Sequence, residues 1–307
     1  MAMKKSMKML LIVLMLIALA SFLSLQALAA PKWSIPDGIK AIEVNGYDMA
    51  YQEVGSGNPL VLIHGSMSDY RTWGTQVPDF SKAYRTISVS LRHSYPEKWN
   101  GDRDDFSVAQ HASDVAALIK NLNNGKVHLL GWSRGGSIAL TVASLYPEVI
   151  RTLVLVDANM LPLIPGTPEE EKWMAAANAS AESVRANLAK GQREKAAQEW
   201  LDLNSRPGTW EKAPDRLKQS ILDNIGTGTD SGERGKFSCA DIQKFNFPIL
   251  LLNGERSPKL YEEMITVMRQ CKPDIPAPLI VPKATHTMHR DNPEFFNKAV
   301  LDFLNQH

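Results

Sequence analysis

A serine flanked by glycines lies near the middle of the chain, in the stretch GWSRG at residues 131–135. The apolar residues before it predict a short buried strand over residues 127–130, and the pattern after it predicts a helix over 137–146 that ends before Pro147. Few residues remain to turn the chain, so small neighbours would let the backbone fold back and present the Ser133 hydroxyl at the apex. The spacing fits the G-x-S-x-G pattern, in which such a turn exposes a nucleophilic serine.

A serine hydroxyl is a weak nucleophile until a base removes its proton, and histidine is the usual base. His286 follows a predicted strand over residues 278–281 and precedes the last predicted helix. That position puts it at the same strand-end edge of a parallel sheet as Ser133. His289, three residues further on, is the substitute candidate. The pair of Ser133 and His286 predicts acyl transfer through a covalent seryl intermediate.

Acyl transfer also needs hydrogen-bond donors for the oxyanion that develops on the substrate carbonyl. The backbone N–H of Arg134 directly follows the nucleophile and is one candidate donor. The backbone N–H of Ser66, after the run LVLIHG, is the other. Five residues near these donors are expected to line the substrate pocket: His64, Gly65, Trp132, Met160 and Trp173.

Short apolar runs alternate with helical patterns along most of the chain. The predicted strands lie at residues 59–63, 85–91, 127–130, 152–156, 248–252 and 278–281. Runs that are apolar nearly throughout are typical of strands covered on both faces. Their alternation with helices predicts an α/β fold with a mostly parallel sheet and right-handed crossovers. Residues 39–53 alternate more in polarity and are expected to form antiparallel edge strands.

The alternation stops over residues 160–238, where no strand is predicted. Thr167-Pro168-Glu169-Glu170 has the pattern of a capping box with proline at the first helical position, and further helices are predicted over 194–203 and 215–225. We expect a helical insertion, called the lid below, between core segments 30–159 and 239–307. The glycine-rich run at 226–235 lacks phosphate-loop spacing and is interpreted as a connector.

The first 29 residues have the pattern of a removable export signal. Three lysines precede the unbroken apolar run at residues 9–20, and Ala27-Leu28-Ala29 provides a small-x-small cleavage site. The alternative, an uncleaved anchor, is less favoured because the apolar run is short for a membrane span. We expect cleavage after Ala29 and a periplasmic or secreted protein without a membrane anchor.

Charge and cysteine content narrow the choice of partners. Loss of the three leader lysines leaves 33 acidic residues in slight excess over the remaining basic ones, which argues against nucleic acid or an anionic membrane as the main partner. Cys239 and Cys271 are either a disulfide or two buried thiols, and both alternatives stay open. Neither cysteine has histidines at ligand spacing, so no metal site is expected.

These features together resemble the α/β-hydrolase superfamily over about residues 39–307. The order of His64-Gly65, the Ser133 elbow, a helical insertion, the late His286 and a closing helix is similar to that family's order. The resemblance implies a cofactor-free serine hydrolase that cleaves a small ester, lactone or thioester. Serine at the elbow separates the chain from the epoxide hydrolases and haloalkane dehalogenases of the same fold, which carry aspartate there.

Other activities fit the same scaffold. One alternative is a carbon–carbon bond hydrolase or a cofactor-independent oxygenase. Another is a lidded ligand-binding protein without turnover.

The acidic member of the implied catalytic triad departs from the family's pattern. The family carries it shortly after the strand over residues 248–252, where this chain reads GERSP with a serine at the expected position. Asp157, at the end of the strand after the elbow helix, is a position that some members use instead. Glu255 is the alternative acid. We favour Asp157, because its strand is expected to lie beside the nucleophile strand.

Overall fold

A twisted sheet of eight strands forms the centre of the computed structural model, which describes residues 33–307 except 103–104, 123–124, 206 and 230–234. The strand order is β1-β2-β4-β3-β5-β6-β7-β8. The strands are β1 (Ile39–Val44), β2 (Tyr47–Val54), β3 (Pro59–Ile63), β4 (Arg85–Val89), β5 (Val127–Trp132), β6 (Ile150–Val156), β7 (Ile249–Gly254) and β8 (Leu279–Val281). The proposed leader at residues 1–29 lies outside the described residues.

The pairing of the strands confirms the predicted α/β class. β1 pairs antiparallel with β2, and β2 pairs antiparallel with β4. The remaining neighbours, from β4 through β8, are parallel. The parallel strands are those that were expected to be covered on both faces, and β3, β5 and β7 are buried at every position. The expectation is wrong for β8, which exposes Leu279 and Ile280 because it lies at the edge of the sheet.

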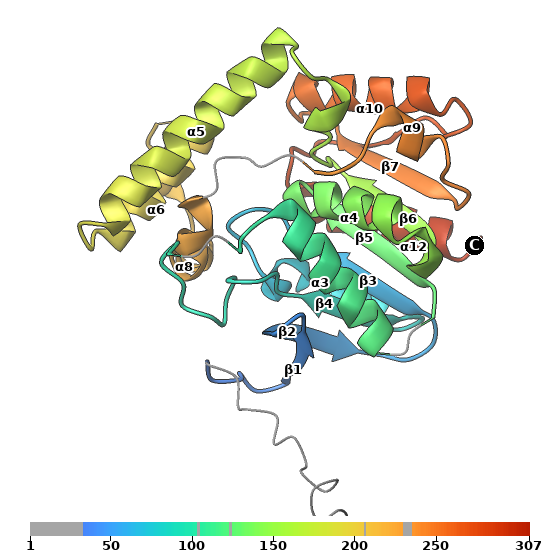
Figure 1. Cartoon of the computed structure of the whole chain (residues 1–307), viewed down its shortest axis with the longest axis horizontal. Helices are drawn as coiled ribbons and strands as arrows, with labels where there is room; N and C mark the ends of the chain where they lie inside the picture. The colour runs from blue at the N-terminus through green and yellow to red at the C-terminus, as the bar shows by residue number, and fades with distance from the viewer. Residues whose placement is uncertain (1–32, 103–104, 123–124, 206, 230–234) are drawn as a thin grey trace, which may run out of the picture. The chain divides into compact units, whose positions relative to one another are not determined.

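Two apolar layers pack on the two faces of the sheet, because successive strand residues point to opposite sides. On one face, strand residues such as Leu129 and Leu153 pack with α3 (Val108–Asn121), α4 (Arg134–Leu145) and α10 (Lys259–Cys271). On the other face, Leu130 and Val154 pack with the short α2 (Val77–Phe80) and α12 (Pro293–Leu304). Figure 1 shows α3 and α4 crossing in front of the sheet.

The predicted lid is helical throughout its described part. It contains η3 (Leu161–Leu163), α5 (Pro168–Leu188), α6 (Arg193–Asn204), α7 (Thr209–Lys212), α8 (Asp215–Asn224) and η4 (Ile225–Thr229). Between β6 and β7 the described residues include no strand. Thr167 caps α5 as predicted, but the Glu170 carboxylate accepts the N–H of Gly166 and not that of Thr167. Of the two reciprocal hydrogen bonds of a capping box, only the one from the Glu170 N–H to the Thr167 hydroxyl is therefore formed.

The lid has its own apolar cluster and a polar tie to the core. Val184, Leu201 and Ile221 pack together between α5, α6 and α8. The Asn224 side chain donates to the buried Asp69 carboxylate at 2.7 Å and accepts the N–H of Tyr95 at 2.8 Å. This hydrogen-bond pair fixes the end of α8 against the loops that follow β3 and β4. No helix among the described residues is long and apolar enough to span a membrane.

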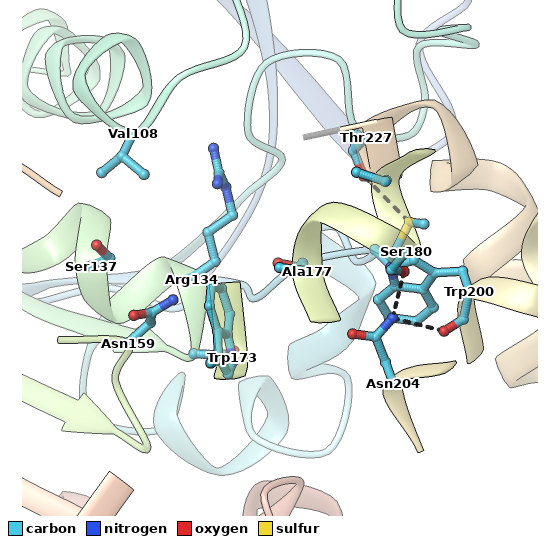
Figure 2. A pocket seen from close by; sticks show the side chains of 15 residues that line it. Val108, Arg134, Ser137, Asn159, Trp173, Ala177, Ser180, Trp200, Asn204 and Thr227 are labelled. Atoms are coloured by element: carbon cyan, nitrogen blue, oxygen red, sulfur yellow. Dashed lines mark hydrogen bonds between the residues drawn. The ribbon is translucent and has the colours of Figure 1, made fainter. Parts of the chain in front are cut away.

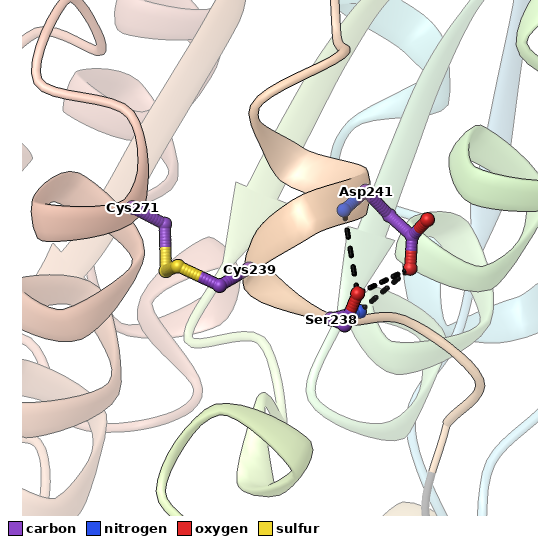
Figure 3. The surroundings of a disulfide bond; sticks show 4 residues. All are labelled: Ser238, Cys239, Asp241 and Cys271. Atoms are coloured by element: carbon purple, nitrogen blue, oxygen red, sulfur yellow. Dashed lines mark hydrogen bonds between the residues drawn. A yellow bond between two sulfur atoms is a disulfide. The ribbon is translucent and has the colours of Figure 1, made fainter.

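The two cysteines form a disulfide, which decides between the two alternatives (Figure 3). Cys239 begins the short α9 (Cys239–Ile242) and Cys271 ends α10, with their Cα atoms 5.2 Å apart. Ser238 and Asp241 close a reciprocal capping box at the start of α9. The bond therefore joins the segment that leaves the lid to the far end of α10.

Replacement of both cysteines by serine is expected to lower the unfolding free energy by about 3–4 kcal/mol, because the bond closes a loop with a sequence separation of 32 residues in the unfolded chain. Urea unfolding with and without reductant measures this. The wild type should lose stability on reduction and the double variant should not respond. Equal stability of the reduced and oxidised wild type would contradict the expectation.

Candidate active site

The nucleophile elbow lies between β5 and α4, where Ser133 adopts a left-handed backbone conformation with φ 55° and ψ −121°. A residue with a side chain adopts such angles only where its surroundings hold it there. The Ser133 N–H donates to the Val156 carbonyl at 3.0 Å, and the Ser133 carbonyl accepts the N–H of Asn159 at 3.0 Å. The elbow is thus hydrogen-bonded on both sides to the end of β6.

The glycines beside the serine are required by close backbone approach. A Cβ atom on Gly131 would lie 2.3 Å from the carbonyl oxygen of Gly135. A Cβ atom on Gly135 would lie 2.4 Å from the carbonyl oxygen of Ile63. Neither position has room for a side chain, because backbone atoms cannot move aside. The G-x-S-x-G spacing therefore allows the tight turn and the packing of α4 against β3.

His286 and Asp157, the predicted base and acid, are in direct contact at this site. The His286 Nδ1 lies 3.1 Å from Asp157 Oδ2, so the Nδ1–H donates to the carboxylate and Nε2 carries the lone pair. Asp157 is fully buried at the end of β6, and it also accepts hydrogen bonds from Asn253 at 2.7 Å and Ser257 at 2.5 Å. Three donors compensate the buried negative charge.

The two alternative residues lie elsewhere. Glu255 is exposed and accepts the backbone N–H of Lys283, so its carboxylate points away from His286. His289 is buried between Trp73 and Trp132, with ring centroids 5.1 Å and 4.7 Å away. Burial lowers the pKa of His289 well below its usual value, so this residue is a neutral core side chain.

Tyr261 is a site residue that the sequence analysis missed. Its ring stacks on His286, with centroids 4.7 Å apart and planes 15° apart. Its hydroxyl lies 3.4 Å from His286 Nε2 and is hydrogen-bonded to Ser133. Burial and the nearby Asp157 carboxylate raise the pKa of Tyr261, so the hydroxyl keeps its proton. The only signal in the sequence was its place four residues after Ser257, in the first turn of the helix that follows β7.

A cavity of about 90 Å³ extends from the nucleophile to the lid (Figure 2). Both candidate oxyanion donors, Ser66 and Arg134, belong to its wall with Ser133. Arg134 is the first residue of α4, where backbone N–H groups have no acceptor within the helix. The rest of the wall comes from core and lid: Met67, Val108, Ser137, Asn159, Trp173, Ala177, Ser180, Ala181, Trp200, Asn204, Thr227 and Gly228.

Only one of the five residues expected to line the pocket belongs to this wall, namely Trp173 of α5. Trp132 instead packs against the His286 ring, and its Nε1–H donates to the His286 carbonyl at 2.8 Å. Met160 is fully buried in the core beside Met264. Gly65 packs against Trp132, because a Cβ atom there would lie 2.9 Å from its ring.

His64 is structural, although its position after β3 suggested a place in the pocket. Its Nδ1–H donates to the Gly65 carbonyl at 2.7 Å, and its Nε2 accepts the Leu91 N–H at 3.0 Å. Burial lowers the pKa of His64 to about 4, so the ring is neutral. It holds the loop after β3, which carries Ser66, against the end of β4.

The chain belongs to the α/β hydrolase fold family, whose sequence profile matches residues 58–293. It is 25% identical to the 2-(acetamidomethylene)succinate hydrolase of Mesorhizobium japonicum over 86% of this chain and 94% of that one. It is 26% identical to the serine hydrolase BPHL of Mus musculus over 86% and 85% of the two chains. An esterase from Thermogutta terrifontis has a similar structure, with a TM-score of 0.67, 24% identity and coverage of 87% and 98%. The protein is thus a hydrolase in its general class.

Asp157→Asn is expected to lower kcat by a factor on the order of 10³–10⁴, because the amide no longer fixes the His286 tautomer or stabilises the imidazolium. Glu255→Gln should leave kcat close to that of the wild type. Ester hydrolysis and the melting temperature of both variants measure this together. A low kcat in Glu255→Gln with Asp157→Asn active would contradict the assignment. Loss of activity in Asp157→Asn only through unfolding would show that Asp157 is a structural residue.

Proposed function

We propose that the protein is a serine hydrolase that cleaves an ester, lactone or thioester through an acyl-enzyme on Ser133. The observation that carries the proposal is the contact of the buried Asp157 with the half-buried His286, together with a serine held in the elbow conformation. The contact of Asp157 with His286 also weighs against the alternative of a ligand-binding protein without turnover. The only support for that alternative was the serine at the position where the family usually carries its acid.

The geometry supports a two-step reaction. The Ser133 oxygen attacks the carbonyl carbon while His286 Nε2 accepts the hydroxyl proton. The backbone N–H groups of Ser66 and Arg134 donate to the oxygen that becomes negative. The tetrahedral intermediate expels the alcohol or thiol, which takes the proton from His286 and leaves the acyl group on Ser133. A water molecule, deprotonated by His286, then releases the acid and restores the serine.

The contact of the Tyr261 hydroxyl with Ser133 and His286 affects the attack of the serine on the substrate. Its hydroxyl is hydrogen-bonded to Ser133 and lies beside Nε2, the atom that must receive the serine proton. Since Tyr261 keeps its proton, it does not compete with His286 as a base. We propose that it orients the serine oxygen and borders the space that the leaving group occupies.

A fluorophosphonate probe tests for an activated serine, since it forms a stable adduct only with a serine that a base activates. The wild type is expected to gain the mass of one adduct on the peptide that carries Ser133 and to lose ester hydrolysis. Ser133→Ala should take up no probe, whereas Ser56→Ala, which changes an exposed serine before β3, should react like the wild type. Absence of labelling in folded wild-type protein would contradict the proposal.

We also propose that the protein is exported and that residues 1–29 are removed. The basic and apolar start of the chain supports this, as does the disulfide, because such bonds persist mainly in oxidising compartments. Mass spectrometry of the protein from its native host is expected to find an N-terminus at Ala30. A mature chain that begins at Met1 in the cytoplasmic fraction would contradict export.

A further inference from the structure

Met67, which directly follows the proposed oxyanion donor Ser66, has a backbone conformation that residues with a side chain rarely adopt. Its φ angle is 52°, in the left-handed region where the Cβ atom crowds the following carbonyl oxygen. Such a conformation persists only where the surrounding structure holds it. Ser66 is exposed, whereas Met67 is 4% exposed. The turn at these two residues therefore leaves Ser66 accessible and buries the side chain of Met67.

The lid encloses the Met67 side chain. Met67 belongs to the apolar cluster around Val184 and Ile221, and every other buried member that the structure describes lies within the lid. The Thr227 hydroxyl donates to Met67 Sδ at 3.6 Å (Figure 2). A Cβ atom on Gly228 would lie 2.1 Å from the Met67 methyl carbon, so the lid contacts the end of this side chain directly. A residue of the loop after β3 is thus packed as part of the lid.

Two polar contacts join the same loop to the same end of the lid. Asp69 accepts a hydrogen bond from the Asn224 side chain at 2.7 Å. Arg71 forms an ion pair with Asp223, with 2.8 Å between Nη2 and Oδ2. These contacts and the Met67 side chain hold one segment of the loop against the end of the lid. A shift of the lid end would therefore shift this loop or break these contacts.

The loop is also held to the core, on the other side of the oxyanion donor. His64 Nε2 accepts the N–H of Leu91 at 3.0 Å. Only Gly65 and Ser66 lie between this core contact and the lid contact of Met67. Two residues between two fixed points have few conformations, so both contacts restrict the direction of the Ser66 N–H. An oxyanion donor is most effective when it is already aimed at the position where the charge develops.

We propose that Met67 is a positioning residue for the oxyanion hole: its insertion into the lid cluster holds the Ser66 N–H in the direction that the tetrahedral intermediate requires. The lid then contributes to the chemical step and does more than cover the cavity. This inference rests on the proposed function, because it assigns a role within acyl transfer to Ser133. It predicts a loss of kcat, since the donor acts on the oxyanion and only weakly on the neutral carbonyl of the bound substrate.

Hydrolysis of phenyl acetate tests the role of Met67, with the melting temperature of each variant as the check on folding. Met67→Ala is expected to lower kcat at least tenfold while KM changes less than threefold. Met67→Leu, which keeps a large apolar side chain, should retain at least a third of the wild-type kcat. Met268→Ala removes another buried methionine, from the core cluster that includes α10, and should keep the wild-type kcat.

Four results would overturn the inference. They are an unchanged kcat in folded Met67→Ala, a loss confined to KM, an equal loss in Met268→Ala, and no recovery in Met67→Leu. Met67→Gly separates the side-chain contact from the backbone conformation, because glycine adopts a φ of 52° freely. Its kcat should fall at least as far as that of Met67→Ala. Wild-type kcat in Met67→Gly would show that the contact has no role and would also overturn the inference.

A change on the lid side tests the same contact without altering the loop. Gly228→Ala places a Cβ atom where the Met67 methyl carbon lies and should lower kcat at least threefold. In the Met67→Ala background the same change should have no further effect, because the two residues act through one contact. Additive losses, or wild-type kcat in Gly228→Ala, would overturn the inference. The second result decides even if Met67→Ala does not fold.

Fluorophosphonate labelling distinguishes failure of this inference from failure of the proposed function. The phosphoryl oxygen of the probe enters the oxyanion hole, so labelling of Ser133 should be at least tenfold slower in Met67→Ala, and this decides even if phenyl acetate is not a substrate. Equal labelling rates would reject the positioning role and keep the serine hydrolase. Absence of labelling in folded wild type would reject both.

Discussion

The site depends on the backbone hydrogen bonds that join three neighbouring strand ends. The Ser133 N–H donates to the carbonyl of Val156, and the Asp157 N–H donates to the carbonyl of Leu252. The first bond holds the serine in its left-handed conformation at the end of β5, and the second fixes the acid at the end of β6 against β7. Because these bonds continue the sheet, the strand order itself positions Ser133 and Asp157.

Asp157, the proposed acid, lies beside the position where the resemblance to the family leads us to expect one. Ser257 stands where the family carries its acid, and its hydroxyl donates to Asp157. Together with Asn253 and His286 it completes the set of donors that an ionised, fully buried carboxylate needs. An acid at the end of β6 can therefore take the place of an acid after β7 under one condition. The residue after β7, here Ser257, must donate a hydrogen bond to that acid and must not carry a second negative charge. Two carboxylates at this distance would raise each other's pKa.

The sequence predicted most strands and helices well, because both kinds of element have signals within a few residues. Strands buried on both faces are apolar nearly throughout, and helices begin at recognisable capping residues. Pro59–Ile63 was predicted to the residue, and α12 has the local start signal of an Asn292 cap with Pro293 at its first position. Side-chain direction at strand ends has no such signal. His64 follows β3 as expected, but its ring turns inward to the Leu91 N–H, a partner 27 residues away. Phe295 belongs to the apolar pattern of α12 but is 38% exposed, because periodicity indicates a helix face without fixing its edges.

The charges around Ser133 leave one good destination for its proton. His64, His111 and His289 are buried, and their pKa values are lowered, so each of them resists protonation. The Arg134 charge contributes to the lowered pKa values of His64 and His111. Of these four histidines, only His286 has a carboxylate on its other ring nitrogen. In the proposed reaction the Asp157 carboxylate behind His286 draws the serine proton to this ring and stabilises the imidazolium that forms.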